Sequence, residues 1–231
     1  ITALLEKHNR LREAFANAER ACKAFPGDER LEEDLLRCYE RDGWTDEAHA
    51  LRRKQFDEGP SVRRFHLTLE TAKAAAKDEA GVRGELLRLL EERELEALRS
   101  EPARSPFAKR HRDSEPPRRN VSLRAAVFCS EQRWGEACEL VQPPAVCDPR
   151  VLRDIALHLP ASDRGEAIAL LLRVFEQAMH TAQTPYRDEL VLVGEIAARL
   201  ETDRRTTWLA SLRSQFRAKR NFVRDLPRPW T

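Results

Sequence analysis

The stretch VSLRAAVFCSEQRWGEACELV, residues 121–141, decides the fold class of this chain. Its apolar residues recur at helical spacing with one interruption at Gln132 and Arg133, which predicts a helix, a tight turn and the opening of a second helix. The apolar positions are Val121, Ala125, Phe128 and Cys129 before the turn and Trp134, Ala137, Cys138 and Val141 after it. A hairpin of this size cannot bury its apolar face alone, so it needs neighbouring helices.

Similar pieces occur elsewhere in the chain. Leu35 to Tyr39 is followed by a corner at Gly43 and Trp44 and then by a Glu-Ala pair, and another Glu-Ala pair, Glu166-Ala167, comes thirty residues after the one that follows Trp134. A small unit that recurs in this way predicts a stack of helix pairs. We therefore expect an all-α fold, a right-handed α-α superhelix or solenoid of antiparallel helix pairs.

Composition favours a soluble helical chain. Among 231 residues, 41% are hydrophobic and 35% charged, only 8 are Gly, and no run of eighteen apolar residues is present. A membrane span is therefore not expected. The chain begins at Ile1 and not at Met, so we expect a piece of a longer protein. It shows no charged segment followed by an apolar one, as a secretory signal would have, so we expect a cytoplasmic protein.

Five cysteines give an odd count without paired CxxC spacing, namely Cys22, Cys38, Cys129, Cys138 and Cys147. The last three recur every nine residues, which directs them to opposite sides of any continuous helix. We interpret the cysteines as small buried residues in a reducing compartment and expect no metal site.

Residues 100–120 separate two predicted lobes, 1–99 and 121–231. This segment holds four prolines, one large apolar residue and alternating charge, so it cannot bury enough surface to offset the entropy of ordering it. We expect a linker or a draped loop. Its cluster Lys109-Arg110-His111-Arg112 is compatible with contact to nucleic acid or to an acidic partner, but a charge run in a linker is usually only solvated.

Helix boundaries follow from the apolar stripes and from Pro and Gly. We expect one long first helix over residues 2–24 and one long last helix over residues 204–220. Between them we expect helices over residues 30–41, 61–77, 82–98 and 149–159. Three more begin at Thr45, Ser162 and Pro185, and the first of these ends before Gly59. The predicted N-caps are Thr45 or Asp46, Asp148, Ser162, and Thr202 or Asp203.

The C-terminal segment is the most basic part of the chain. Residues 203–231 hold eight Lys or Arg and two Asp, a net charge of +6 against +2 for the whole chain. Two interpretations remain open. In the first, arginines spaced by four, three and four residues form one helical stripe that contacts phosphates or an acidic protein. In the second, they pair with Asp188, Glu189 or Glu195 of the neighbouring helix and cap the array. We favour the second. These arginines are Arg213, Arg217, Arg220 and Arg224.

No catalytic constellation is visible. The chain has no glycine-rich phosphate loop, no HExxH and no GxSxG motif, and its six histidines are scattered singly at positions 8, 49, 66, 111, 158 and 180. We therefore expect a non-enzymatic protein without cofactor, catalytic residues or small-molecule substrate. Trp44 and Trp134 are interpreted as structural hairpin corners that lock one helix against its partner.

Three segments carry a resemblance to a known family: GEAIALLLRVFEQAM (165–179), YRDELVLVGEIAARL (186–200) and WLASLRSQFRAKRNFVRDL (208–226). They resemble the helical-repeat region that follows a SWIM-type zinc finger in a group of bacterial proteins. The corners at Trp44 and Trp134 also resemble tetratricopeptide repeats, although the spacing of about 34 residues is not kept. The CxC and CxH ligands of such a finger are absent, so the resemblance implies a finger upstream of this chain.

These observations predict a helical-repeat scaffold that presents a concave surface to a protein partner, or to other domains of its own chain. The alternative is a nucleic-acid-binding module that uses the C-terminal arginines.

Overall fold

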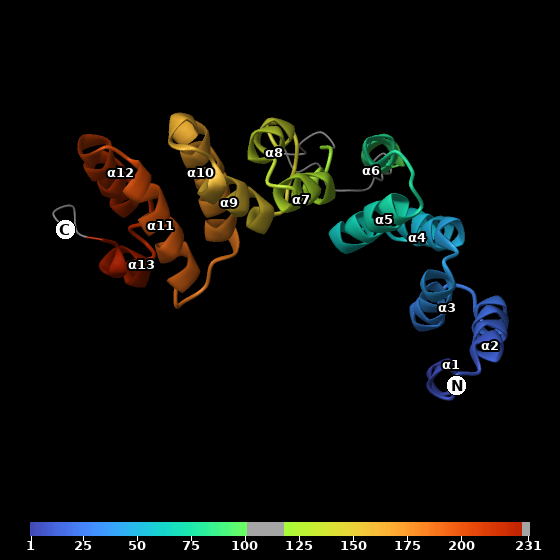
Figure 1. Ribbon diagram of the computed structural model, residues 1–231. Coiled ribbons are helices and arrows are strands. Elements are labelled where there is room, and N and C mark those ends of the chain that lie inside the picture. The colour runs from blue at the N-terminus through green and yellow to red at the C-terminus, as the bar shows by residue number, and fades with distance from the viewer. Residues whose placement is uncertain (101–117, 228–231) are drawn as a thin grey trace. The chain divides into compact units, whose positions relative to one another are not determined.

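The computed structural model describes residues 1–100 and 118–227, and in these ranges the chain is helical throughout, with one isolated β-bridge between Asn120 and Val146 (Figure 1). The all-α prediction is confirmed. None of the helices in the described part combines the length and the apolar character needed to cross a bilayer. Most of the predicted linker, residues 101–117, lies outside the described residues.

The chain divides into two compact units, Ile1–Arg93 (unit 1) and Glu94–Thr231 (unit 2). In unit 1 each of the first four helices packs on the next one in sequence. The helices are α1 (Thr2–Lys7), α2 (Leu11–Ala24), α3 (Glu29–Asp42), α4 (Thr45–Glu58), α5 (Val62–Ala74) and α6 (Glu79–Ser100), the last of which runs past the division. A small core of Ala18, Leu35 and Cys38 joins α2 to α3, and Phe56 meets Phe65 between α4 and α5 with ring centroids 6.2 Å apart.

Unit 2 holds the larger described core. Its elements are α7 (Ser122–Ser130), α8 (Trp134–Leu140), α9 (Pro149–His158), the 3₁₀ turn η1 (Ala161–Asp163), α10 (Arg164–Thr181), α11 (Arg187–Arg199), α12 (Thr202–Gln215) and α13 (Arg220–Asp225). One continuous cluster of buried side chains runs from Val121 to Leu226. Arg173 fastens α10 to the loop after α8 by donating to the carbonyls of Val141 and Ala145, at 2.7 and 3.0 Å.

The hairpin at residues 121–141 forms as predicted. Gln132 takes a positive φ of 59°, and Arg133 donates its backbone N–H to the carbonyl of Phe128 at 2.9 Å, which closes α7 and redirects the chain into α8. Val121, Ala125, Ala137 and Val141 are each at most 1% exposed. The hairpin is covered by α9, which packs on both of its helices.

The predicted first helix, residues 2–24, is wrong as a single element. The structure breaks it at Asn9, whose φ of 54° is left-handed, and Arg10 donates its backbone N–H to the carbonyl of Leu5 at 2.9 Å. Asparagine tolerates this conformation better than most residues and ends a helix here as glycine usually does. The short α1 then lies against α2, where Asn17 Nδ2 donates to Thr2 Oγ1 at 3.0 Å.

The predicted last helix, residues 204–220, is also wrong as a single element. Helix α12 ends at Gln215, a turn follows, and α13 starts at Arg220. The reason is aromatic packing. Phe216 and Phe222 both pack on Phe175, with centroid distances of 6.0 and 6.2 Å, whereas six residues of continuous helix would direct them to different faces.

The caps were predicted in part. Asp148 caps α9 by accepting from the backbone N–H of Arg150 at 2.7 Å, which confirms that prediction. The other three predicted caps are wrong: helices α4, α10 and α12 have Trp44, Asp163 and Glu201 at their N-caps, none with a side-chain capping bond. Serine and threonine at these places lie one position inside a helix or in η1.

Candidate functional site

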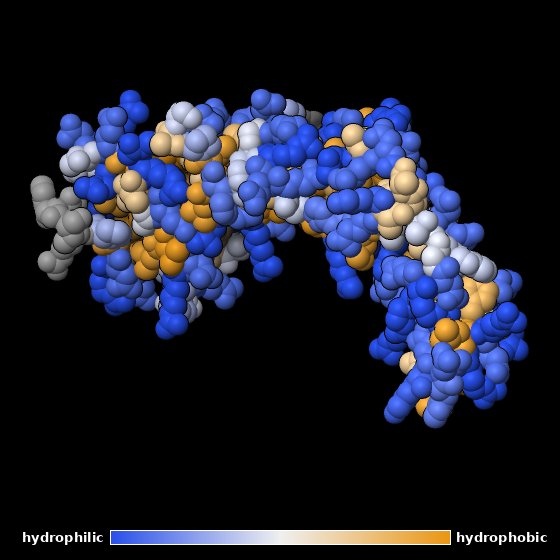
Figure 2. Space-filling model, viewed as in Figure 1, coloured by the Kyte–Doolittle hydropathy of each residue, from blue (hydrophilic) through white to orange (hydrophobic). Residues whose placement is uncertain are grey.

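An apolar groove lies in unit 2 between α10, α11 and α12, with a volume of about 430 Å³. Its floor is the buried Ile196, and its walls are the half-buried side chains of Ile168, Leu172, Leu200 and Trp208. Its rim is polar and comes from α12 alone, through Asp203, Arg204, Thr207 and Ser211, all exposed. In Figure 2 hydrophobic residues reach the surface over α11 and α12, among hydrophilic ones.

The charged groups on the rim of the groove are not engaged within the described part of the chain. The carboxylate of Asp203 and the guanidinium of Arg204 make no hydrogen bond or ion pair with residues 1–100 or 118–227; the backbone carbonyl of Asp203 accepts from Thr207. The groove thus combines apolar walls with one acidic and one basic group available to a ligand.

Helix α12 is held in place by an aromatic cluster. Trp208 meets Phe175 edge to face at 6.3 Å, on the inner side of the groove wall, and Phe222 contacts Phe175, Phe216 and Tyr186 with centroid distances of 5.5 to 6.2 Å. Because such pairs add to the burial of apolar area, the cluster fixes the wall that α12 contributes.

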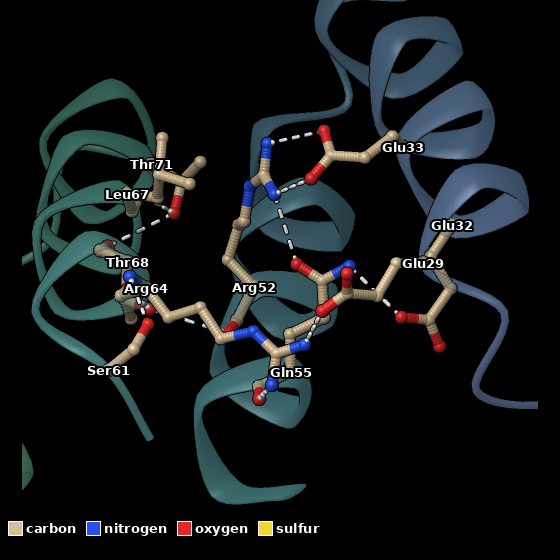
Figure 3. A network of polar contacts seen from close by, with 10 residues as sticks. All are labelled: Glu29, Glu32, Glu33, Arg52, Gln55, Ser61, Arg64, Leu67, Thr68 and Thr71. Atoms are coloured by element: carbon tan, nitrogen blue, oxygen red, sulfur yellow. Dashed lines mark hydrogen bonds and ion pairs between the residues drawn. The ribbon is translucent and has the colours of Figure 1, made fainter. Parts of the chain in front are cut away.

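A second concavity, the polar pocket, lies in unit 1 between α3, α4 and α5 (Figure 3). Its volume is about 320 Å³, and its lining residues are Glu29, Arg30, Glu33, Arg52, Gln55, Ser61, Arg63, Arg64 and Leu67. Figure 3 shows the Arg52 guanidinium reaching from α4 to Glu33 on α3, and Arg64 reaching from α5 toward Glu29. Polar side chains from three helices therefore converge on one place.

Arg52 is the centre of this network. Its side chain is only 8% exposed and forms a two-pronged ion pair with Glu33, with Nη2 2.9 Å from one carboxylate oxygen. Nη1 also donates to Gln55 Oε1 at 3.0 Å, and Gln55 in turn donates to the buried Glu32 at 3.0 Å. A buried charge is tolerated only with such partners, so the network holds α3 and α4 in register.

Arg64 joins α5 to the same network. Its Nη1 donates to the backbone carbonyls of Gln55 and Gly59, at 2.8 and 2.7 Å, and its Nη2 pairs with Glu29. The two carbonyls belong to the last turn of α4 and its C-cap, where a cation also complements the helix dipole. Arg64 is thus a structural clamp as well as a lining residue of the polar pocket.

The four C-terminal arginines do not form the predicted helical stripe, because the break between α12 and α13 places them on different elements. Arg213 is half-buried, and its Nη2 donates to the Pro227 carbonyl at 2.7 Å. Arg224 pairs with Asp225 at 2.7 Å, and that guanidinium holds the pKa of the exposed carboxyl below its usual range. Arg217 and Arg220 are exposed.

The favoured alternative, pairing of these arginines with the neighbouring helix, is also wrong for Glu195. Its carboxylate accepts from Arg153 of α9 at 3.0 and 2.5 Å, which raises the pKa of that guanidinium. None of the four arginines makes an ion pair with Asp188 or Glu189 within the described residues. Glu195 is therefore paired with another helix, and Asp188 and Glu189 pair with none of the four arginines.

Both predicted corner tryptophans lie at the start of a second helix. Trp44 is 45% exposed and contacts Phe15 and Tyr39, with centroids 5.0 and 5.9 Å away. Trp134 stacks on His158 of α9, at 4.2 Å and nearly parallel. Each indole thus bridges helices.

The cysteines lie free in the structure, four of them buried and Cys22 half-buried. Burial raises the pKa of Cys129 to about 12 and that of Cys147 to about 11. Across residues 1–100 and 118–227 no three His, Cys, Asp or Glu side chains are grouped to hold a metal ion.

The polar pocket was not predicted from the sequence. A signal was present on α4, where the buried face consists of Ala48, Arg52, Gln55 and Phe56. An arginine and a glutamine at core positions of a helix indicate a buried polar network.

No protein-family model, curated protein or solved structure matches this chain. The resemblance to helical repeats that follow a SWIM-type finger accordingly stays a prediction.

Proposed function

We propose that this chain is a non-enzymatic helical-repeat scaffold that binds a protein partner, and that the apolar groove of α10, α11 and α12 receives it. The observation that carries the proposal is the groove itself, apolar on its floor and walls and polar along one edge. Concave sites of this kind preferentially bind segments that can bury apolar side chains.

The occupant we infer is an amphipathic helix of the partner. Such a helix presents apolar residues at i, i+3, i+4 and i+7 along one edge and charged residues beside them, which matches a groove whose charges lie on one side only. Because the side chains of Asp203 and Arg204 form no ion pair with the described residues, a basic residue on the partner helix would pair with Asp203 and an acidic one with Arg204.

The test is selection of helical peptides from a display library on the purified chain, followed by fluorescence anisotropy of the enriched peptides. We expect enriched sequences to share the i, i+3, i+4, i+7 apolar pattern and to lose binding to Leu172→Glu, which puts a charge in the groove wall. Thr207→Arg, at an exposed rim position, should also weaken binding without touching the core.

The matched control is Val191→Glu, which makes the same kind of change at an apolar residue of α11 that is 52% exposed and outside the groove lining. Binding should survive it. Absence of any enriched pattern, or peptides that bind Leu172→Glu and Thr207→Arg as well as they bind the parent chain, would overturn the proposal.

Nucleic-acid binding is the second candidate, favoured by the exposed Arg217 and Arg220. It has less support than the groove because Arg213 is held by a backbone carbonyl and Arg224 by a carboxylate.

A further inference from the structure

The polar pocket of unit 1 carries excess positive charge. Four arginines, Arg30, Arg52, Arg63 and Arg64, and two glutamates, Glu29 and Glu33, line it, which gives a formal charge of +2. Guanidinium groups recognise oxyanions by paired N–H donors, and in a concave, partly desolvated site these bonds are stronger than at a flat surface.

The cations of the polar pocket are more deeply buried than the anions that pair with them. The Arg52 side chain is 8% exposed and its partner Glu33 is 46% exposed; Arg64 is 23% exposed and its partner Glu29 is 69% exposed. Arg52 also bonds to Gln55, and Arg64 also bonds to two backbone carbonyls, so neither guanidinium depends on its carboxylate alone. Each arginine thus has partners besides its glutamate, and the glutamates are the more exposed members of the two pairs.

Two further observations indicate unused donor capacity. The Nε of Arg52 is buried and has no hydrogen-bond partner within the described residues. Arg30 and Arg63 line the pocket with exposed side chains that form no hydrogen bond or ion pair with residues 1–100 or 118–227. Long exposed arginines at the mouth of a basic pocket can fold over a bound anion and add paired donors to it.

We propose that the polar pocket binds a phosphate monoester, whose oxygens take the places that the Glu29 and Glu33 carboxylates occupy beside Arg64 and Arg52. With both carboxylates displaced into solvent, four guanidinium groups remain, and they favour a dianion over a single carboxylate. The volume of about 320 Å³ is near the lower end of the range for small-ligand pockets, so the ligand is a phosphorylated side chain or a small phosphorylated compound. The proposal concerns unit 1 and does not depend on the groove of unit 2.

The test is isothermal titration calorimetry of the whole chain with inorganic phosphate, O-phosphoserine, and a phosphoserine peptide beside its unphosphorylated form, at constant ionic strength. Arg30→Ala and Arg63→Ala should each weaken binding about tenfold, the value of one charge-assisted hydrogen bond. Both residues are exposed, so these variants should fold, as far-UV circular dichroism can verify. Glu33→Gln should strengthen binding several-fold, because it removes the carboxylate that competes with the ligand for Arg52.

Glu85→Gln is the matched control for Glu33→Gln. Glu85 pairs with Arg53 at 3.2 Å, also between helices of unit 1 but outside the polar pocket, so the substitution changes the net charge equally. Its effect on affinity should be small.

Tighter binding of the phosphopeptide than of phosphate and O-phosphoserine would identify a protein-borne ligand, and equal or tighter binding of the small compounds would identify a free one. Either result supports the phosphate site. The proposal fails if neither the parent chain nor Glu33→Gln binds any of the phosphates, or if Glu85→Gln strengthens binding as much as Glu33→Gln does.

Discussion

Replacement of Phe222 by Ala tests how the C-terminal segment is held. The Phe222 ring is fully buried and contacts Phe175, Tyr186 and Phe216 with centroid distances of 6.2, 5.6 and 5.5 Å. A buried Phe→Ala change costs about 3–5 kcal/mol, through lost transfer free energy and the cavity left behind. Phe222 is the one buried residue of the six-residue α13, so release of this helix can relieve part of the cavity. We expect a loss near the lower value, about 3 kcal/mol.

The assay is urea unfolding followed by far-UV circular dichroism, together with hydrogen exchange of peptides that cover α10, α12 and α13. Exchange should accelerate first in α13 and then in α10 around Phe175, which loses one of its three aromatic partners. Phe25→Ala is the control, because that side chain is 65% exposed and its removal should change stability by less than about 0.5 kcal/mol. A loss below about 1 kcal/mol for Phe222→Ala, or unchanged exchange in α13, would refute the packing argument.

Three further predictions concern titration, thiol reactivity and nucleic acid. Burial, and secondly Lys77, lowers the pKa of His49 below its ordinary value of 6.5. The stability this contributes is present above pH 6.5 and is lost as the pH falls through the folded-state pKa. The free energy of unfolding of unit 1 in urea should therefore decrease toward pH 5, and His49→Gln should flatten that dependence. With a pKa of about 12, Cys129 carries about a thousandfold less thiolate than an ordinary thiol, so mass spectrometry after iodoacetamide treatment at pH 8 should show Cys22 alkylated first and Cys129 only on unfolding. If the chain binds a labelled DNA duplex or single strand, the double variant Arg217→Ala/Arg220→Ala should lower both the affinity and its salt dependence, whereas Arg213→Ala should change neither. Equal effects of the two variants would show that only the total positive charge of the chain matters.

The helices were predictable where one local pattern sets them. The apolar stripe of residues 121–141 places α7, α8 and the turn between them, because a 3.6-residue period depends only on neighbours in sequence. The breaks at Asn9 and after Gln215 were not predictable in this way. The first depends on a left-handed residue that is asparagine and not glycine, and the second on Phe216 and Phe222 meeting Phe175, some forty residues earlier in the chain.

The sites were less accessible from sequence than the helices. Arg52 and Glu33 are nineteen residues apart on different helices, and no periodic pattern in the sequence predicts that they pair. The groove needs Leu172, Ile196 and Trp208 from three helices. The predicted arginine stripe was wrong for the same reason, since it assumed one continuous helix where tertiary packing imposes two. Spacing arguments hold within an element and fail where the chain turns.

The ammonium group of Lys219 has a consequence for assembly. It donates to the carbonyl of Met179 at 2.9 Å, in the last turns of α10, and lies 5.4 Å from the centre of the Tyr186 ring, so the turn before α13 is fastened across the apolar end of unit 2. The same turn leaves Arg217 and Arg220 pointing outward. In a two-fold contact through this turn, Arg217 and Arg220 would meet the same two arginines of the second copy. The exposed charge of this turn therefore works against a two-fold contact between copies through it.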